Sequence, residues 1–312
     1  MIKKLNKLTN EKVPYIVISN FDGTALEVYT LQEAQKENIV FSISHDTKYT
    51  PHHLHLHKEP VSLQSYTKKF NQIIEHIKQG NTYLCNLTQP TKITTTATLD
   101  EIYQRTNATY KIKYKEKFVC FSPESFIQID QNGKIATFPM KGTIDATLPN
   151  ALEQILSNQK EMAEHIMVVD LLRNDLGIIA NDVKVEKFRF PITVKTNQKT
   201  LLQISSKITA KLPNKWQNNF AELLLQLLPA GSITGTPKKK TTQIIKEVEG
   251  YERGYFTGVF GYFDGECFDS CVMIRFIEQT DKGFVYKSGG GITIDSDPLA
   301  EYNELLDKVY LP

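Results

Sequence analysis

"GGGITIDSDPLAEYNELLDK", residues 289–308, joins a glycine triplet to a predicted helix near the end of the chain. The triplet consists of Gly289, Gly290 and Gly291. Because glycine has no side chain, the backbone N–H groups of such a run stay open to a close-lying anion. Asp297 and Pro298 are typical of a helix N-cap and first turn. The stretch therefore predicts an anion-binding segment that leads directly into a helix.

Two predicted helices carry matching pairs of glutamates. Glu301 and Glu304 lie in this last helix, and Lys308 follows one turn later on the same face. Glu161 and Glu164 lie in the earlier segment "KEMAEH". Four carboxylates that converge on one point would raise each other's pKa unless a cation lay between them. Mg²⁺ prefers such oxygen ligands, so the spacing fits a magnesium site, and it also fits two ordinary solvated helix faces.

One lysine lies in an unusually restricted setting. Lys141 is part of "FPMKGT", residues 138–143, between a proline and a glycine. Pro139 fixes its own φ and removes a hydrogen-bond donor, while Gly142 allows backbone conformations that other residues avoid. A simple strand end that turns into a loop explains this pattern. A lysine held in place for chemistry also explains it.

The order of predicted elements favours one fold class. Hairpins are predicted about Asp22-Gly23 and Asn132-Gly133. The second hairpin would place Glu124 at the start of one strand and Lys141 past the end of its partner. One long helix is predicted through residues 151–172. Strands and helices mix without a regular βαβ rhythm, which favours an α+β fold with largely antiparallel sheets.

Composition excludes several classes of function. The 312 residues include 37 Lys and Arg against 35 Asp and Glu, a net charge of +2 that gives no electrostatic case for nucleic acid or a membrane surface. No apolar run approaches membrane-spanning length, and four cysteines are too few for a disulfide framework, so we expect a cytoplasmic protein. The stretch "HHLHLH", residues 52–57, fits a connector between prolines or a zinc or nickel site.

Three long segments together resemble the chorismate-utilising enzymes, a family that includes anthranilate, isochorismate, salicylate and aminodeoxychorismate synthases. They are "AEHIMVVDLLRNDLG" (163–177), "GSITGTPKKKTTQIIKEVE" (231–249) and residues 289–308. The resemblance covers roughly residues 65–312 and implies a chorismate-binding catalytic domain there. Residues 1–64 would form a short β region and histidine-rich connector of the same fold. The implied architecture is like that of anthranilate synthase component I, with two stacked, largely antiparallel sheets and helices outside.

The resemblance also implies roles for individual residues. Glu164 and Glu304 match the direct ligands of Mg²⁺, and Glu161 and Glu301 match their water-linked neighbours. Glu124 matches the general acid that protonates the departing hydroxyl on carbon 4 of chorismate. The implied substrate-binding residues are Arg275, Lys308, Thr143, Gly289, Gly290 and Gly291.

Lys141 distinguishes between branches of the family. Its position is characteristically alanine in anthranilate synthases and lysine in aminodeoxychorismate synthases. The resemblance therefore implies that Lys141 attacks carbon 2 of chorismate and that ammonia then displaces it at carbon 4. The product would be 4-amino-4-deoxychorismate, on the route to 4-aminobenzoate and folate. An anthranilate synthase component I and a non-catalytic chorismate-binding homologue are the alternatives.

Departures from the family pattern bear on the second substrate. Members that add water carry a lysine where this chain has Leu84, so the resemblance favours ammonia over water. No glutaminase-type Cys-His arrangement is present, so ammonia would come from solution or from a separate glutaminase subunit. Phe256 replaces a tyrosine that is often found at its position, so the resemblance does not carry over that tyrosine's hydrogen bond to the substrate.

Overall fold

The computed structural model of the chain describes residues 1–45, 54–195 and 200–311. Of the histidine-rich stretch, His52 and His53 lie outside these residues, and His57 begins a short strand at the edge of a sheet. No helix in the three described ranges is long and apolar enough to cross a membrane.

The first sheet contains nine strands among the described residues, and every pairing in it is antiparallel. In spatial order they are β10 (Met140–Asp145), β12 (Thr200–Lys211), β9 (Lys134–Thr137), β8 (Ser125–Ile129), β15 (Phe268–Val272), β14 (Val259–Phe263), β1 (Tyr15–Ser19) and β2 (Leu26–Thr30), and β11 (Asn181–Lys195) pairs with β12. The N-terminal hairpin β1–β2 therefore belongs to the same sheet as strands from the end of the chain.

The second sheet contains eight strands in the described ranges and is also antiparallel throughout. In spatial order they are β13 (Gly235–Thr236), β5 (Leu84–Thr94), β17 (Gly283–Ile292), β16 (Phe276–Thr280), β7 (Phe118–Ser122), β6 (Tyr110–Tyr114) and β3 (Ile39–Ile43), and β4 (His57–Glu59) pairs with β5. The predicted α+β class with antiparallel sheets is confirmed.

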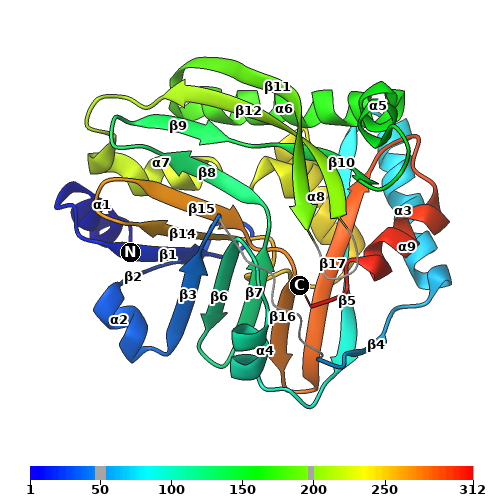
Figure 1. The fold of residues 1–312 in the computed structure, drawn as a ribbon, viewed down its shortest axis with the longest axis horizontal. Helices are drawn as coiled ribbons and strands as arrows, with labels where there is room; N and C mark the ends of the chain where they lie inside the picture. Colours follow the sequence, from blue (N-terminus) through cyan, green and yellow to red (C-terminus); the bar gives the residue numbers. More distant parts are fainter. Residues whose placement is uncertain (46–53, 196–199, 312) are drawn as a thin grey trace.

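The helices lie around the two sheets (Figure 1). Helices α3, α8 and α9 pack beside β5 and β17, whereas α6 lies along β11 and β12. The bounds are α1 (Ile2–Asn10), α2 (Leu31–Lys36), α3 (Leu63–Lys78), α4 (Leu99–Arg105), α5 (Ala151–Ser157), α6 (Gln159–Ile179), α7 (Phe220–Gln226), α8 (Lys238–Glu249) and α9 (Pro298–Asp307), with 3₁₀ turns η1 (Trp216–Asn219) and η2 (Gly231–Ile233).

Strand β1 shows how the layers stack. All five of its residues are buried, so both of its faces are covered. Tyr15 and Val17 belong to a hydrophobic cluster that includes residues of α1, α6, α7 and α8. Ile16 and Ile18 belong to another cluster, which they share with residues of β6, β7 and β16 in the second sheet. Because alternate strand residues point to opposite faces, β1 lies between a helical layer and the second sheet.

One prediction about local structure is wrong. The predicted single helix through residues 151–172 is two helices, because Asn158 is extended and its side chain accepts the Glu161 N–H as the N-cap of α6. Lys141 lies past the end of β9, as the second hairpin predicted, and is part of a separate strand, β10, that pairs with β12. The predicted hairpins about Asp22-Gly23 and Asn132-Gly133 are confirmed.

Candidate active site

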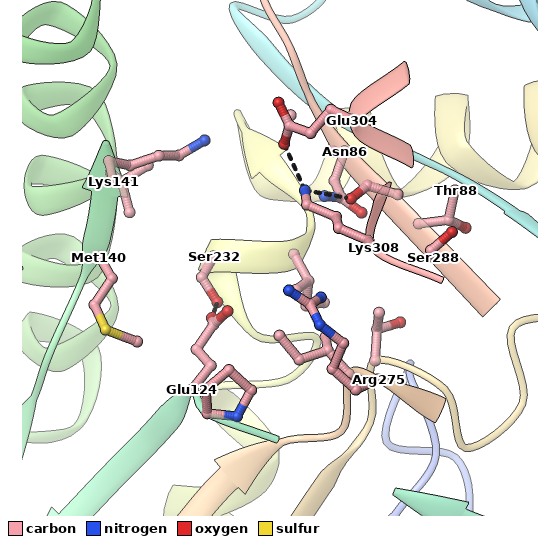
Figure 2. Close-up of a pocket in the computed structure, with 18 of the residues that line it drawn as sticks. Asn86, Thr88, Glu124, Met140, Lys141, Ser232, Arg275, Ser288, Glu304 and Lys308 are labelled. Carbon is pink, nitrogen blue, oxygen red and sulfur yellow. Dashed lines mark hydrogen bonds and ion pairs between the residues drawn. The ribbon is translucent and has the colours of Figure 1, made fainter. Parts of the chain in front are cut away.

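A cavity of about 260 Å³ lies between β10 of the first sheet and the β5–β17 pair of the second. Turn η2 and the C-terminal end of α9 complete its wall. Figure 2 shows Lys141 on one side, Glu304 and Lys308 opposite, and Glu124 and Arg275 below. The cavity thus collects most of the residues that the sequence singled out, from segments far apart in the chain.

A β-bulge presents Lys141 to this cavity. The pairing of β10 with β12 shifts register between Met140 and Thr143, and Gly142 has a φ of +84°. Glycine is favoured at such a left-handed position because it has no Cβ. The Lys141 Nζ lies 3.5 Å from Glu164 Oε2, and its side chain is 23% exposed, so substrate can reach the amine. Thr143, on the same strand, also lines the cavity.

The glycine triplet forms the end of β17 rather than a turn, opposite residues 86–88 of β5. The Gly289 carbonyl accepts a hydrogen bond from Lys308 Nζ at 2.8 Å, and the opposite residue, Thr88, donates its N–H to Glu249. Gly289 and Thr88 therefore form a non-hydrogen-bonded pair, in which the N–H and C=O groups of each residue point away from the other strand. The N–H groups of Gly289 and Gly291 consequently point to the other edge of β17, beyond Lys287, the last residue that pairs with β16. This geometry suits an anion at that edge.

We expect Gly291→Ala to reduce turnover of the substrate roughly ten- to a hundredfold, because misplaced reacting groups lose rate steeply. A Cβ there would lie 3.3 Å from Lys141 Nζ and 3.1 Å from Leu84 Cδ1, both tight contacts. Gly177→Ala, on α6 and outside the cavity lining, is the control, since a Cβ there would meet nothing within 4 Å. Steady-state kinetics and circular dichroism on both variants test this, and equal activity of the two would contradict it.

Glu124 lies just before β8 and accepts a hydrogen bond from the Ser232 hydroxyl. Burial raises the pKa of its carboxyl, although the Ser232 hydrogen bond and three nearby cations, Lys141, Lys308 and Arg275, each act to lower it. The net direction is upward, which favours the protonated form that a general acid needs.

Arg275 lies in the segment between β15 and β16 and has a left-handed φ of +54°. Its guanidinium lies over the Tyr310 ring, 5.3 Å from the ring centroid. In the described part of the chain its buried Nε has no hydrogen-bond partner. A buried donor without a partner is costly, so this side chain is suited to an anionic ligand in the cavity.

The four predicted magnesium ligands come from two helices. Burial raises the pKa of Glu161, and Glu164 and Glu304 raise it further. Burial also raises the pKa of Glu301, with Glu304 and Glu164 adding to it. Burial would raise the pKa of Glu304 as well, but Lys308, whose Nζ is 2.6 Å away, holds it below its usual value. The carboxylates of α6 and α9 therefore lie close enough to perturb one another.

In this structure, lysine ammonium groups balance the negative charges of Glu164 and Glu304. Glu164 contacts both Lys141 and Lys160, whose Nζ is 3.9 Å away. Within the described ranges, no three His, Cys, Asp or Glu side chains lie close enough together to hold a metal ion. The donor set nevertheless has the chemistry that Mg²⁺ prefers, because it consists of carboxylates that repel one another.

Several cavity residues received no role from the sequence. Leu84 and Phe256, which depart from the family pattern, both line the cavity. Further lining residues without a predicted role are Asn86, Thr88, Met140, Gln203, Ser232, Lys287 and Ser288. Ser232 lies inside the segment 231–249, so its motif was visible in the sequence while its contact with Glu124 was not.

The sequence is similar to a known protein family and to individual members of it. Residues 13–311 match the family described as chorismate binding enzyme. A Haemophilus influenzae protein described as an uncharacterized PabA-like protein is 45% identical over 315 residues, 100% of this chain and 96% of that protein. Aminodeoxychorismate synthase component 1 of Escherichia coli is 33% identical over 266 residues, 80% of this chain and 57% of that protein. This chain thus spans little more than half of that relative's length.

A solved structure supports the family at the level of the fold. Anthranilate synthase component I from Streptococcus pneumoniae has a TM-score of 0.68 at 25% identity, covering 82% of this chain and 58% of that chain. The family match spans nearly all residues, and the predicted resemblance is confirmed. The chain therefore belongs to the chorismate-binding enzymes, close to aminodeoxychorismate synthase component 1.

Proposed function

We propose that the chain is an aminodeoxychorismate synthase component I, which converts chorismate and ammonia to 4-amino-4-deoxychorismate. The observation that carries this proposal is the Lys141 amine, which extends into the cavity where the anthranilate synthases of the family characteristically have alanine. The identity to component 1 of Escherichia coli supports the same branch.

The chemistry would proceed in two displacements. The Lys141 Nζ forms a bond to carbon 2 of chorismate, both ring double bonds shift by one position, and the bond from carbon 4 to its hydroxyl oxygen breaks. Glu124 gives its proton to that oxygen, which leaves as water. Ammonia then bonds to carbon 4, both double bonds shift back, and the bond from carbon 2 to Nζ breaks. Arg275, Lys308 and the edge of β17 would hold the substrate carboxylates.

Magnesium is part of the proposal. Glu164 and Glu304 would bind the ion directly, with Glu161 and Glu301 acting through water. When bound, the ion would neutralise charge on a substrate carboxylate and help to orient it. The protein residues would meanwhile orient the ring, supply the nucleophile and deliver the proton.

We also propose a cellular setting. Ammonia would come from solution or from a separate glutaminase subunit, and the reaction would take place in the cytoplasm. A further lyase would be needed to release 4-aminobenzoate for folate synthesis.

The proposal predicts one product. Incubation with chorismate, magnesium and an ammonium salt should give 4-amino-4-deoxychorismate, identified by liquid chromatography and mass spectrometry against the standard. Formation of anthranilate instead would assign the chain to the anthranilate synthases. Chorismate that binds in calorimetry and is recovered unchanged would identify a non-catalytic homologue.

A further inference from the structure

Turn η2 presents one hydroxyl to the carboxyl of Glu124. Ser232 is the middle residue of this three-residue 3₁₀ turn, and its Oγ donates to Glu124 Oε1. Both residues line the cavity, and they are 108 positions apart in the sequence. The contacts that hold the backbone of this turn therefore determine how well the position of the Ser232 hydroxyl is fixed.

A buried ion pair holds the first residue of the turn. Asp175, in α6, is 2.7 Å from Lys238 Nζ at the start of α8, and its side chain is only 6% exposed. Burial raises the pKa of Asp175, while Lys238 and the Gly231 N–H both act to lower it, so the carboxyl also holds the backbone of the turn. A Cβ on Gly231 would lie 2.7 Å from Asp175 Oδ2, so glycine lets the turn approach this closely.

A second buried ion pair holds the last residue of the turn. Arg253 donates from Nη1 to the Ile233 carbonyl at 3.0 Å. Its Nε and Nη2 donate to the two oxygens of Glu249, at 2.9 and 2.7 Å, in a bidentate pair that is almost completely buried. Nη2 also donates to the carbonyl of Asn86, a further cavity residue. The turn is therefore held at both ends by buried ion pairs, and within the described residues no hydrogen bond or ion pair joins either of them to Glu124.

Buried ion pairs add little stability compared with well-packed apolar residues of similar size, because taking the charges out of water is costly. With one such pair at each end of a three-residue turn, the backbone of the turn is held in place. We propose that Ser232 is a positioning residue for Glu124: its hydroxyl occupies Oε1, so that the other carboxyl oxygen carries the proton that is delivered to the substrate. This inference rests on the proposed function, and it assigns the Asp175–Lys238 and Glu249–Arg253 pairs to holding the turn.

The groups around Glu124 determine whether its pKa rises or falls in Ser232→Ala. Lys141 from β10, Lys308 from the end of α9 and Arg275 from the β15–β16 segment all act to lower its pKa, as does the Ser232 hydrogen bond. In Ser232→Ala the three cations remain and one donor to the carboxylate is lost. The Glu124 pKa must therefore rise, and the acid stays protonated to higher pH.

Ser232→Ala and Ser232→Thr test the proposal, with Ser157→Ala as the control, since Ser157 lies on α5 and donates to Glu153 there. In Ser232→Ala we expect the basic limb of the kcat/KM profile to move to higher pH and kcat to fall roughly tenfold. Ser232→Thr should restore both, and the control should match the wild type. A basic limb that does not move in Ser232→Ala would overturn the proposal.

Two further measurements separate this proposal from the reaction itself. The ¹³C carboxyl resonance of Glu124, assigned by its loss in Glu124→Gln, should titrate at higher pH in Ser232→Ala even if the enzyme turns over no chorismate. In a double-mutant cycle, Ser232→Ala should cost little activity when Glu124 is already glutamine, because Ser232 acts through that carboxyl. An unchanged titration, or an equal cost in both backgrounds, would contradict a positioning role.

Discussion

In the Lys141→Ala variant we expect formation of 4-amino-4-deoxychorismate to fall at least about a hundredfold, with some product shifting to the 2-amino isomer. The reason is that ammonia then reaches carbon 2, the position that the lysine amine would otherwise occupy. Glu124 and the acidic residues remain in place, so departure of the hydroxyl is still assisted. Chromatography of the products formed from chorismate, magnesium and ammonia measures both effects.

A covalent adduct provides the second readout of the same variant. Wild-type protein incubated with chorismate and magnesium without ammonia should become heavier by chorismate less water. Digestion should place the adduct on the peptide that contains residues 140–143. Lys141→Ala should show no adduct, whereas Lys239→Ala, which removes an exposed lysine of α8, should still show it. Undiminished 4-amino product from Lys141→Ala would establish that Lys141 is not a nucleophile.

For Glu164→Gln and Glu304→Gln we expect loss of magnesium-dependent turnover by about a hundredfold or more, with the fold intact. Glutamine keeps the shape of each side chain and removes the charge that a divalent cation needs. In Glu164→Gln the Lys141 amine also loses its partner at 3.5 Å. Initial rates across a magnesium titration, together with calorimetry of magnesium binding in the absence of chorismate, measure the two consequences separately.

Glu247→Gln serves as the control for these variants, because Glu247 is exposed on α8. It should bind magnesium and turn over chorismate as the wild type does. Full activity of either Glu164→Gln or Glu304→Gln at ordinary magnesium concentrations would mean that these carboxylates are not the metal ligands.

Local chemistry explains which parts of the fold were predictable. The hairpins about Asp22-Gly23 and Asn132-Gly133 depend on residues only a few positions apart, and both are present. The break at Asn158 carried a similar local signal, an N-cap residue followed three positions later by Glu161. Continuous helical periodicity on both sides obscured that signal. Strand β10 could not be predicted in the same way, because its partner β12 lies some sixty residues further along.

The candidate site likewise combines features that local sequence patterns predicted with contacts that they did not. Spacing within a helix predicted the pairs on α6 and α9, since residues three apart share a face. The contact of Ser232 with Glu124 joins segments that only the folded chain brings together. The link from Asp175 to Lys238 joins two of the sequence motifs, yet no pattern within either motif encodes the other.

The bulge in β10 has a consequence for how this family can diversify. Its geometry depends on Gly142 and on pairing with β12, and Pro139 is held through its carbonyl by Ser206. None of these supports involves the side chain at position 141. If Lys141 acts as proposed, an exchange of that side chain would change which atom attacks the ring, while the backbone around it would be held as before. Under the proposed function, a single substitution at position 141 would change the chemistry and leave the supports of this strand in place.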